Sequence, residues 1–275
     1  MKKLPIIAMV AAAATLMAGA KEPWNALMNR AERAYNSGDY AGAEAAYSEM
    51  LRDYPESQRA MVLYNLGVMQ TYQGKDAEAL LTLDSAVVLD PENPRILEQR
   101  ATLLYEKGDL DGARADYEKV VAADDSATTA MFMLGSIALN QNDTATALRS
   151  FEKLRALQPE EEGTLMAFAG YYTKVKDYPA AIAQYDKLIE RKPEAQTLIS
   201  RAANYLMLDS LDAAAADIDR AITLAPDDGE AYYMRAALAK KRYDLQGTKA
   251  DAQKALELGV SARRIQALLG ALPEE

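Results

Sequence analysis

A rhythm of about 34 residues runs through most of this chain and constrains its fold more than any other feature. Five of the ten prolines mark it, at Pro55, Pro91, Pro159, Pro193 and Pro226. Successive members are 36, 68, 34 and 33 residues apart, and the interval of 68 is two periods. The phase set by these prolines divides the chain into seven units, which are 24–57, 60–93, 94–127, 128–161, 162–194, 195–228 and 229–262.

Small side chains occupy the same two positions of the units. Two helices approach to about 8–10 Å only where the side chains at their crossing are small, so each unit is predicted to hold a helix pair. The eighth residue of each unit is Ala31, Gly67, Ala101, Gly135, Ala169, Ala202 or Ala236. The twentieth is Ala43, Ala79, Ala113, Ala147, Ala181, Ala214 or Thr248. Four residues later, six units carry a large apolar residue, at Tyr47, Leu83, Tyr117, Phe151, Tyr185 and Ile218, and the seventh carries Ala252.

Turn residues separate the two predicted helices of a unit. Residues that tolerate a left-handed conformation follow the first helix at Gly38, Gly74, Gly108 and Asn142. Aspartates that suit the cap of the second helix come next, at Asp39, Asp109, Asp143, Asp177 and Asp244. Pro179 fits the first turn of its helix, where a missing N–H costs nothing. Each unit therefore predicts two helices of about three to four turns joined by a tight loop.

At these residues the sequence resembles the tetratricopeptide repeat. Asn65-Leu66-Gly67 and Leu134-Gly135 are similar to the first-helix signature of that family, and Ala79 and Leu89-Asp90-Pro91 to the second-helix signature. The first unit departs with Arg30-Ala31, and the last departs with Thr248 and Val260. Terminal repeats are expected to be irregular because one of their faces meets water.

The resemblance implies an all-α fold, an α-solenoid wound as a right-handed superhelix. We expect seven helix–turn–helix repeats within residues 21–275. Residues 263–270 carry Ile265, Leu268 and Leu269, and they are predicted to form a capping helix over the seventh repeat.

The resemblance also implies that the first helices line a concave surface. Positions 2, 5, 6, 9, 12 and 13 of each unit would face it, and we call them the first-helix stripe. Its charges balance, with acids at Glu32, Glu98, Glu106 and Glu230 and bases at Arg95, Lys174, Lys240 and Lys241. Its methionines are Met28, Met61, Met133, Met166, Met207 and Met234, and its aromatic residues are Tyr35, Tyr64, Tyr72, Tyr105, Phe132 and Tyr233.

Methionine and tyrosine suit surfaces that accept apolar partners, so this stripe predicts a groove for a peptide or protein segment. The candidate groove residues are Met28, Asn29, Tyr64, Asn65, Phe132, Met133, Met166, Met207, Tyr233 and Met234. The alternative is that these methionines pack within the superhelix and that both asparagines are structural. The family's clamp for acidic chaperone tails is not expected, because Met28, Glu32 and Gln99 stand at its basic and polar positions.

The first twenty residues predict a secretory signal peptide. Lys2 and Lys3 precede the apolar stretch from Leu4 to Met17, and Ala18-Gly19-Ala20 matches a small-residue cleavage site. Ala20 stands where a bacterial lipoprotein would carry its lipid-bearing cysteine. We therefore expect a periplasmic or secreted protein with no membrane insertion after cleavage, and an uncleaved anchor is the alternative.

The composition of the chain excludes several classes of ligand and site. The formal charge is −10, and removing residues 1–20, which hold two lysines and no acid, makes it −12, a balance that disfavours nucleic acid. The chain lacks cysteine and histidine, so disulfides and zinc sites of sulfur or imidazole are excluded, and no metal or cofactor is predicted. Gly74-Lys75 precedes Asp76 and so does not match a phosphate loop.

The sequence thus predicts a non-catalytic scaffold or adaptor of the cell envelope that binds a partner peptide or protein. A structural subunit that self-associates is the alternative, and the oligomeric state is left open. A carboxylate-based enzyme is a remote alternative, because the paired acids at 124–125, 160–162 and 227–228 fall at predicted helix junctions.

Overall fold

The computed structural model describes residues 21–56 and 58–270, and within them the chain is all-α, with fifteen helices and no strand. The predicted fold class, a helical repeat solenoid, is confirmed. The predicted signal peptide at 1–20 lies outside the described residues.

The chain divides into two compact units, Met1–Asp125 and Ser126–Glu275, named unit 1 and unit 2 here. The helices of unit 1 are α2 (Trp24–Asn36), α3 (Tyr40–Asp53), α4 (Arg59–Tyr72), α5 (Asp76–Leu89), α6 (Pro94–Glu106) and α7 (Leu110–Ala123). Those of unit 2 are α8 (Thr128–Asn140), α9 (Thr144–Leu157), α10 (Glu162–Lys174), α11 (Tyr178–Arg191), α12 (Ala195–Met207), α13 (Leu211–Leu224), α14 (Gly229–Lys241), α15 (Leu245–Glu257) and α16 (Ala262–Leu269).

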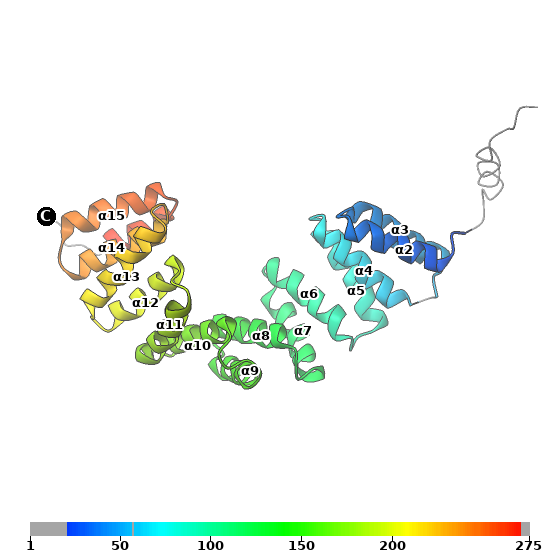
Figure 1. The fold of residues 1–275 in the computed structure, drawn as a ribbon, viewed down its shortest axis with the longest axis horizontal. Helices are drawn as coiled ribbons and strands as arrows, with labels where there is room; N and C mark the ends of the chain where they lie inside the picture. The colour runs from blue at the N-terminus through cyan, green and yellow to red at the C-terminus, as the bar shows by residue number, and fades with distance from the viewer. Residues whose placement is uncertain (1–20, 57, 271–275) are drawn as a thin grey trace, which may run out of the picture. The chain divides into compact units, whose positions relative to one another are not determined.

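Consecutive helices form hairpins, as Figure 1 shows for α2 with α3 and for α14 with α15. Within a unit, each hairpin packs on the next through its second helix, so that α3 contacts α4 and α11 contacts α12. Each predicted repeat therefore contributes one helix pair, and its apolar faces are covered by its neighbours.

The small residues lie at the helix crossings. All the alanines predicted there are fully buried, and so is Thr248. A methyl group on Gly67 would lie 2.8 Å from Cγ of Leu83, and one on Gly135 would overlap the ring of Phe151. The large residue of the second helix thus occupies the space that the small residue of the first helix leaves open.

The predicted turns are also present. Gly38, Gly74, Gly108 and Asn142 have φ between 63° and 83°, the left-handed region. The five predicted aspartates each accept a hydrogen bond from a backbone N–H in the first turn of the second helix. Pro179 lies in the first turn of α11. In the other repeats of unit 2, Lys176, Asp209 and Tyr243 take the left-handed position, which the sequence did not indicate.

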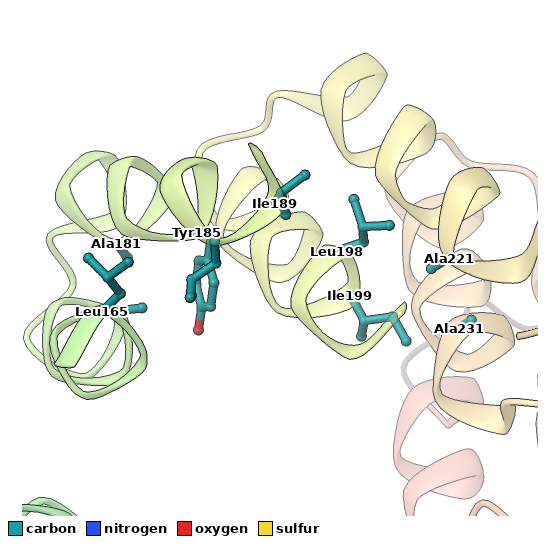
Figure 2. Close-up of a cluster of buried hydrophobic side chains, with 10 residues drawn as sticks. Leu165, Ala181, Tyr185, Ile189, Leu198, Ile199, Ala221 and Ala231 are labelled. Carbon is teal, nitrogen blue, oxygen red and sulfur yellow. The ribbon is translucent and has the colours of Figure 1, made fainter. Parts of the chain in front are cut away.

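The core of unit 2 runs across the repeats. Leu165 of α10 and Tyr185 of α11 belong to the same buried cluster as Leu198 and Ile199 of α12 (Figure 2). Ala221 of α13 and Ala231 of α14 extend this cluster to the last full repeat. This cluster therefore joins the fifth, sixth and seventh repeats.

The helix α16 closes the seventh repeat. Its Ile265 is buried against Ala236, Ala252 and Ala255, and Leu268 and Leu269 are half-buried in the same cluster. Lys240 of α14 donates a hydrogen bond to the carbonyl oxygen of Leu268 at 2.6 Å. The small Ala252, which replaces the large apolar residue of the other repeats, is thus fully buried beside this helix.

Candidate protein-binding surfaces

None of the ten predicted groove residues is fully buried. Asn29, Met166 and Met207 are exposed, and Met166 and Met207 have 37% and 59% of their surface accessible. The other seven, which are Met28, Tyr64, Asn65, Phe132, Met133, Tyr233 and Met234, are half-buried. The stripe therefore presents side chains to solvent along both units.

Part of the stripe also supports the core. Met28 packs against the buried cluster of the first repeat, and Tyr64 packs against Leu83 and Leu103. Met234 contacts two clusters of unit 2. Part of the side-chain surface of these three residues is therefore buried by packing within the fold.

In unit 2 the stripe of two neighbouring repeats surrounds a hollow of about 440 Å³. We call it the α8–α10 hollow. Its lining residues are Phe132, Ser136, Leu139, Asn140, Phe151, Met166, Ala167, Gly170, Thr173 and Lys174. All of them except Phe151, which belongs to α9, occupy stripe positions of α8 or α10. The structure thus brings the predicted Phe132 and Met166 to one site, and it leaves Met133 out of the lining.

The α8–α10 hollow is largely apolar because its hydroxyl groups are already bonded. The Ser136 hydroxyl donates to the carbonyl oxygen of Phe132 at 2.8 Å. The Thr173 hydroxyl lies 2.9 Å from the carbonyl oxygen of Ala169 and 3.0 Å from Oδ1 of the buried Asn204. The one charged residue among the lining is Lys174, which is exposed. This arrangement suits an apolar side chain that lies near a negative group.

Gly170 keeps the hollow open. Its position in α10 faces α8, and a methyl group added there would have Cδ2 of Leu139 as its nearest atom, at 3.9 Å. Gly170 is position 9 of its repeat and therefore a stripe position. The sequence gives it no role, because the space beside a glycine is known only when its neighbours in the fold are known.

The last three predicted residues lie farther along unit 2. Met207 is at the end of α12, and Tyr233 and Met234 are on α14. The guanidinium of Arg264, from the cap helix, stands 4.4 Å from the centroid of the Tyr233 ring and pairs with Glu230. Tyr233 therefore helps to hold α16 against α14. A partner that binds at Tyr233 would contact a ring that Arg264 already partly covers.

In unit 1 the stripe is rich in tyrosine. Tyr40 and Tyr72 stack with their ring centroids 4.7 Å apart, and Tyr35 lies 6.1 Å from Tyr72. Tyr35 and Tyr72 are 43% and 53% exposed. Contact with the Tyr35 hydroxyl raises the pKa of Tyr72, and burial raises the pKa of Tyr64.

Arginine–aspartate pairs form a second repeated feature, which the sequence analysis missed. Arg100, Arg201 and Arg235 each bond both carboxylate oxygens of an aspartate sixteen residues later, at 2.6–2.9 Å. The aspartates are Asp116, Asp217 and Asp251, and the first two are 3% and 5% exposed. Hydrogen bonding to these aspartates raises the pKa of each arginine. The signal was an arginine directly before the first small residue, paired with an aspartate directly before the position of the large residue, which is Ala252 in the seventh repeat.

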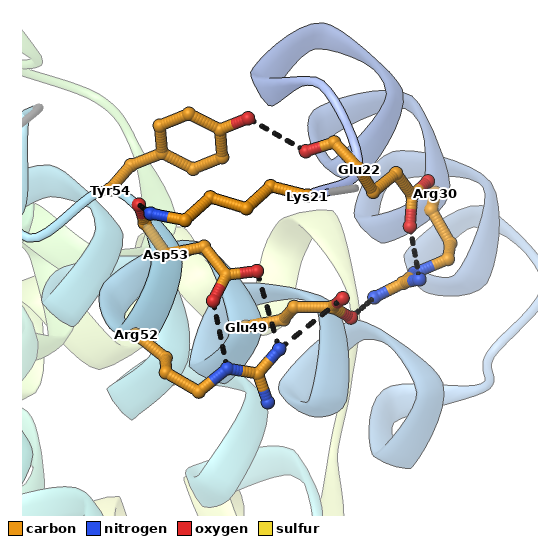
Figure 3. A network of polar contacts seen from close by, with 7 residues as sticks. All are labelled: Lys21, Glu22, Arg30, Glu49, Arg52, Asp53 and Tyr54. Carbon is orange, nitrogen blue, oxygen red and sulfur yellow. Dashed lines mark hydrogen bonds and ion pairs between the residues drawn. The ribbon is translucent and has the colours of Figure 1, made fainter. Parts of the chain in front are cut away.

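A polar network covers the outer end of the first repeat (Figure 3). Arg30 pairs with Glu22 at 2.5 Å and with Glu49. The Tyr54 hydroxyl donates to the carbonyl oxygen of Glu22 at 2.8 Å, and Lys21 Nζ donates to that of Asp53 at 2.8 Å. Arg30 therefore joins both helices of the first repeat to the segment before α2.

Two of the acids considered for catalysis have structural partners. Glu160 pairs with Lys187 and Arg191, and Asp228 caps α14 by accepting from the Glu230 N–H. Across residues 21–56 and 58–270, no group of three or more acids could hold a metal ion. Over the same residues, every helix is too short or too polar to cross a bilayer.

Comparison with known proteins decides the family. The family model described as "Tetratricopeptide repeat" matches residues 11–94, 99–162 and 171–229. The chain belongs to the tetratricopeptide repeat family. Tetratricopeptide repeats imply a scaffold for protein–protein interaction, and this coarse function follows from the membership.

One solved structure and two curated sequences illustrate what the chain is similar to. A tetratricopeptide repeat protein from Parabacteroides merdae has a solved structure that superposes with a TM-score of 0.71, at 25% identity, over 89% of this chain and 96% of that one. Mouse "DnaJ homolog subfamily C member 3" is 26% identical over 82% of this chain and 46% of its own length. The "Probable biofilm formation methyltransferase WspC" of Pseudomonas putida is 35% identical over 33% of this chain and 21% of its own. The chain thus spans less than half the length of these two curated relatives.

Proposed function

We propose that this protein is a non-catalytic adaptor of the cell envelope that captures an apolar side chain of a partner segment in the α8–α10 hollow. The observation that carries the proposal is the convergence of nine stripe positions from two repeats on one apolar hollow. The location rests on the signal peptide predicted at residues 1–20.

The physical basis is the removal of apolar surface from water. Enclosing one large apolar side chain contributes about 1.5–3 kcal/mol, and a hollow of this volume has room for one. Phe132 of α8 and Met166 of α10 line the hollow from its two helices. Phe132 provides an aromatic ring, and Met166 provides a flexible thioether. Lys174 adds a preference for a partner that carries a negative charge beside the apolar residue.

The direct test fills the hollow. Gly170→Leu places its Cβ at van der Waals distance from Leu139 and extends a side chain into the hollow. It also replaces a poor helix former, so we expect the fold to be retained, which far-UV circular dichroism checks. Partner binding should be lost. Gly163→Ala, in the same helix with no neighbour within 4 Å of its added methyl group and outside the lining, is the matched control and should bind normally.

The partner is identified by a photo-crosslinking residue at Met166, with the same residue at the exposed Ala183 of α11 as the control. A peptide synthesised from the crosslinked segment is then titrated against both glycine variants by fluorescence anisotropy. Equal affinity of Gly170→Leu and native protein for that peptide would remove the hollow from the mechanism. Cell fractionation and N-terminal sequencing of the mature protein test the envelope location.

Self-association is the second candidate, and α5 favours it. The outer face of this helix exposes Leu81, Val88 and Leu89, with 70%, 81% and 50% of their surfaces accessible. Exposed apolar residues grouped on one helix often mark an interface. Light scattering after size-exclusion chromatography should show a larger assembly for the native chain and a smaller one for Leu81→Lys with Val88→Glu. A monomer in both cases would exclude this role.

A further inference from the structure

The outer face of α5 in unit 1 is apolar and open to solvent. Among the large aliphatic side chains that the structure describes, Val88 and Leu81 are the most exposed, at 81% and 70%. Ser85 lies between them on the same side of the helix, four residues after Leu81 and three before Val88. The Ser85 hydroxyl donates to the carbonyl oxygen of Leu81 at 2.9 Å. These three residues, which we call the α5 ridge, can therefore leave water with the serine hydroxyl still bonded.

The α8–α10 hollow in unit 2 has the complementary form. It is concave and largely apolar, and its Ser136 and Thr173 hydroxyls are bonded within the protein. An apolar helix face that enters an apolar groove is a common mode of protein recognition. The α5 ridge offers two aliphatic side chains, and the hollow offers Phe132 and Met166. Contact between them would remove apolar surface from water on both sides.

The charged residues beside the two surfaces are also complementary. Glu78 precedes Leu81 by three residues, and Lys174 follows Gly170 by four, so each charge lies about one helical turn from the apolar position on its own helix. Both charged side chains are exposed, and neither has an ion pair within the described part of the chain. With Leu81 beside Gly170, the carboxylate and the ammonium group are therefore both available to each other.

We propose that Leu81 of one copy of this chain enters the α8–α10 hollow of a second copy, with Glu78 of the first copy paired to Lys174 of the second. The inference rests on the proposed function, because it names the segment that the hollow captures, and it specifies what α5 contacts. The two surfaces differ, so the contact is head-to-tail and the second copy can bind a third.

Complementation between two variants is the decisive experiment. Gly170→Leu fills the hollow and keeps the α5 ridge, whereas Leu81→Lys with Val88→Glu disrupts the ridge and keeps the hollow. In sedimentation velocity over a concentration series, the native chain should form assemblies that grow with concentration, and each variant alone should be a monomer. An equal mixture of the variants should form a complex of two chains and nothing larger, because only one ridge and one hollow remain.

Each variant has a matched control. Gly163→Ala adds a methyl group to α10 outside the lining of the α8–α10 hollow. Leu224→Lys with Leu256→Glu makes the same changes of charge as the ridge variant, at exposed leucines of α13 and α15. Both controls should assemble as the native chain does. Far-UV circular dichroism confirms that every variant is folded.

Reversal of the two charges tests the ion pair. Glu78→Lys and Lys174→Glu should each weaken the association by about two- to fivefold, the range expected for an exposed pair. The chain that carries both substitutions restores the attraction between copies, so its association should return to the native strength. If the double substitution is weaker than either single one, the two charges do not meet.

Three results would overturn the inference: a native chain that is a monomer throughout, a mixture of the two variants that yields no complex, or native-like assembly of Gly170→Leu, which would indicate contact between two α5 helices. The proposed function is judged separately by the photo-crosslinker at Met166. Crosslinking to another protein, together with a monomeric native chain, would keep the hollow as a binding site and remove the second copy as its occupant.

Discussion

Units 1 and 2 are built from the same helix pair, yet their stripes have opposite character. In unit 1 the stripe is acidic and rich in tyrosine. In unit 2 its charged residues are Glu230, Lys174, Lys240 and Lys241, a net formal charge of +2, and it surrounds an apolar hollow. The small residues at the crossings are the same in both, so the scaffold and the surface vary independently. A repeat fold can thus change the charge and composition of its stripe without any change in its packing rules.

The repeats also differ in the side chains that join their two helices. The third, sixth and seventh repeats join their helices through an arginine–aspartate pair, whereas the fourth has Leu134 and Ser150 at the same two positions. Both solutions occur within unit 2. The ionic one is costly to break, because removal of the aspartate takes two charged hydrogen bonds from the arginine.

The largest effect is expected from breaking such a pair. Asp116→Ala in unit 1 and Asp217→Ala in unit 2 should each lower the free energy of unfolding by about 1.5–3 kcal/mol, since each removes two charged hydrogen bonds from a largely buried arginine. The arginine keeps its second partner, Asp84 or Asp186, which limits the loss. Urea unfolding is followed by circular dichroism for the whole chain and by fluorescence of Trp24, the single tryptophan, for unit 1. Asp217→Ala should leave the Trp24 transition in place.

The control is a double variant that places the residue pair of one repeat in another repeat of the same chain. Arg201→Leu with Asp217→Ser copies Leu134 and Ser150 of the fourth repeat and should recover most of the lost stability. If Asp217→Ala shifts the Trp24 transition as far as Asp116→Ala does, the two units unfold as one body and their separation is wrong.

The next effect comes from the helix crossings. Gly135→Ala should cost about 1–3 kcal/mol, because its methyl group meets the rigid ring of Phe151. Gly67→Ala should cost less, since Leu83 can change its rotamer. Gly163→Ala adds the same methyl group in open space and should stabilise its helix slightly. Thermal unfolding of the three variants ranks them, and equal costs at Gly67 and Gly135 would contradict the packing argument.

Loss of a helix cap should have a smaller effect in either unit. Asp109→Ala in unit 1 and Asp177→Ala in unit 2 each remove a hydrogen bond to a first-turn N–H and should cost about 1 kcal/mol. Ser210→Ala is the control, because Ser210 begins α13 without a capping side-chain bond. Urea unfolding should separate the aspartates from the serine, and a comparable loss at Ser210 would mean that capping is not the cause.

The smallest effect concerns the charge of Glu98. Burial raises its pKa in the folded state, so folding favours the protonated form. The stability that it contributes is complete below the ordinary value of 4.5 and is lost as the pH rises through the raised value. Glu98→Gln should therefore stabilise unit 1 at pH 7 by less than about 1 kcal/mol, because the group is partly solvated, and should have no effect near pH 4.

The readout at both pH values is the melting temperature from Trp24 fluorescence for Glu98→Gln, and from circular dichroism of the whole chain for the unit 2 control. Glu230→Gln changes a stripe glutamate of unit 2 that is paired with Arg264, and it should not stabilise the protein at either pH. A stabilisation by Glu98→Gln that is the same at pH 4 and pH 7 would show that the cost does not come from the charge.

The sequence by itself determined the repeat, the helix pairs and the residues at their crossings. Ala113 and Ala147 could be placed there because a close approach of two helices admits only small side chains, and this requirement repeats with the period of the chain. The capping aspartates and left-handed turns were predictable for the same reason, since local backbone geometry selects the residue type. The stripe followed from the family resemblance and from helical spacing.

Only the tertiary structure decided what the stripe does in each place. It showed that Phe132 and Met166 share a hollow while Met28 and Met234 also support the core. It also revealed the importance of Gly170, and it joined Arg100 to an aspartate sixteen residues away. These features depend on contacts between different helices. The period of a sequence shows which residues share a face, but the distances across that face are set by the packing of neighbouring side chains.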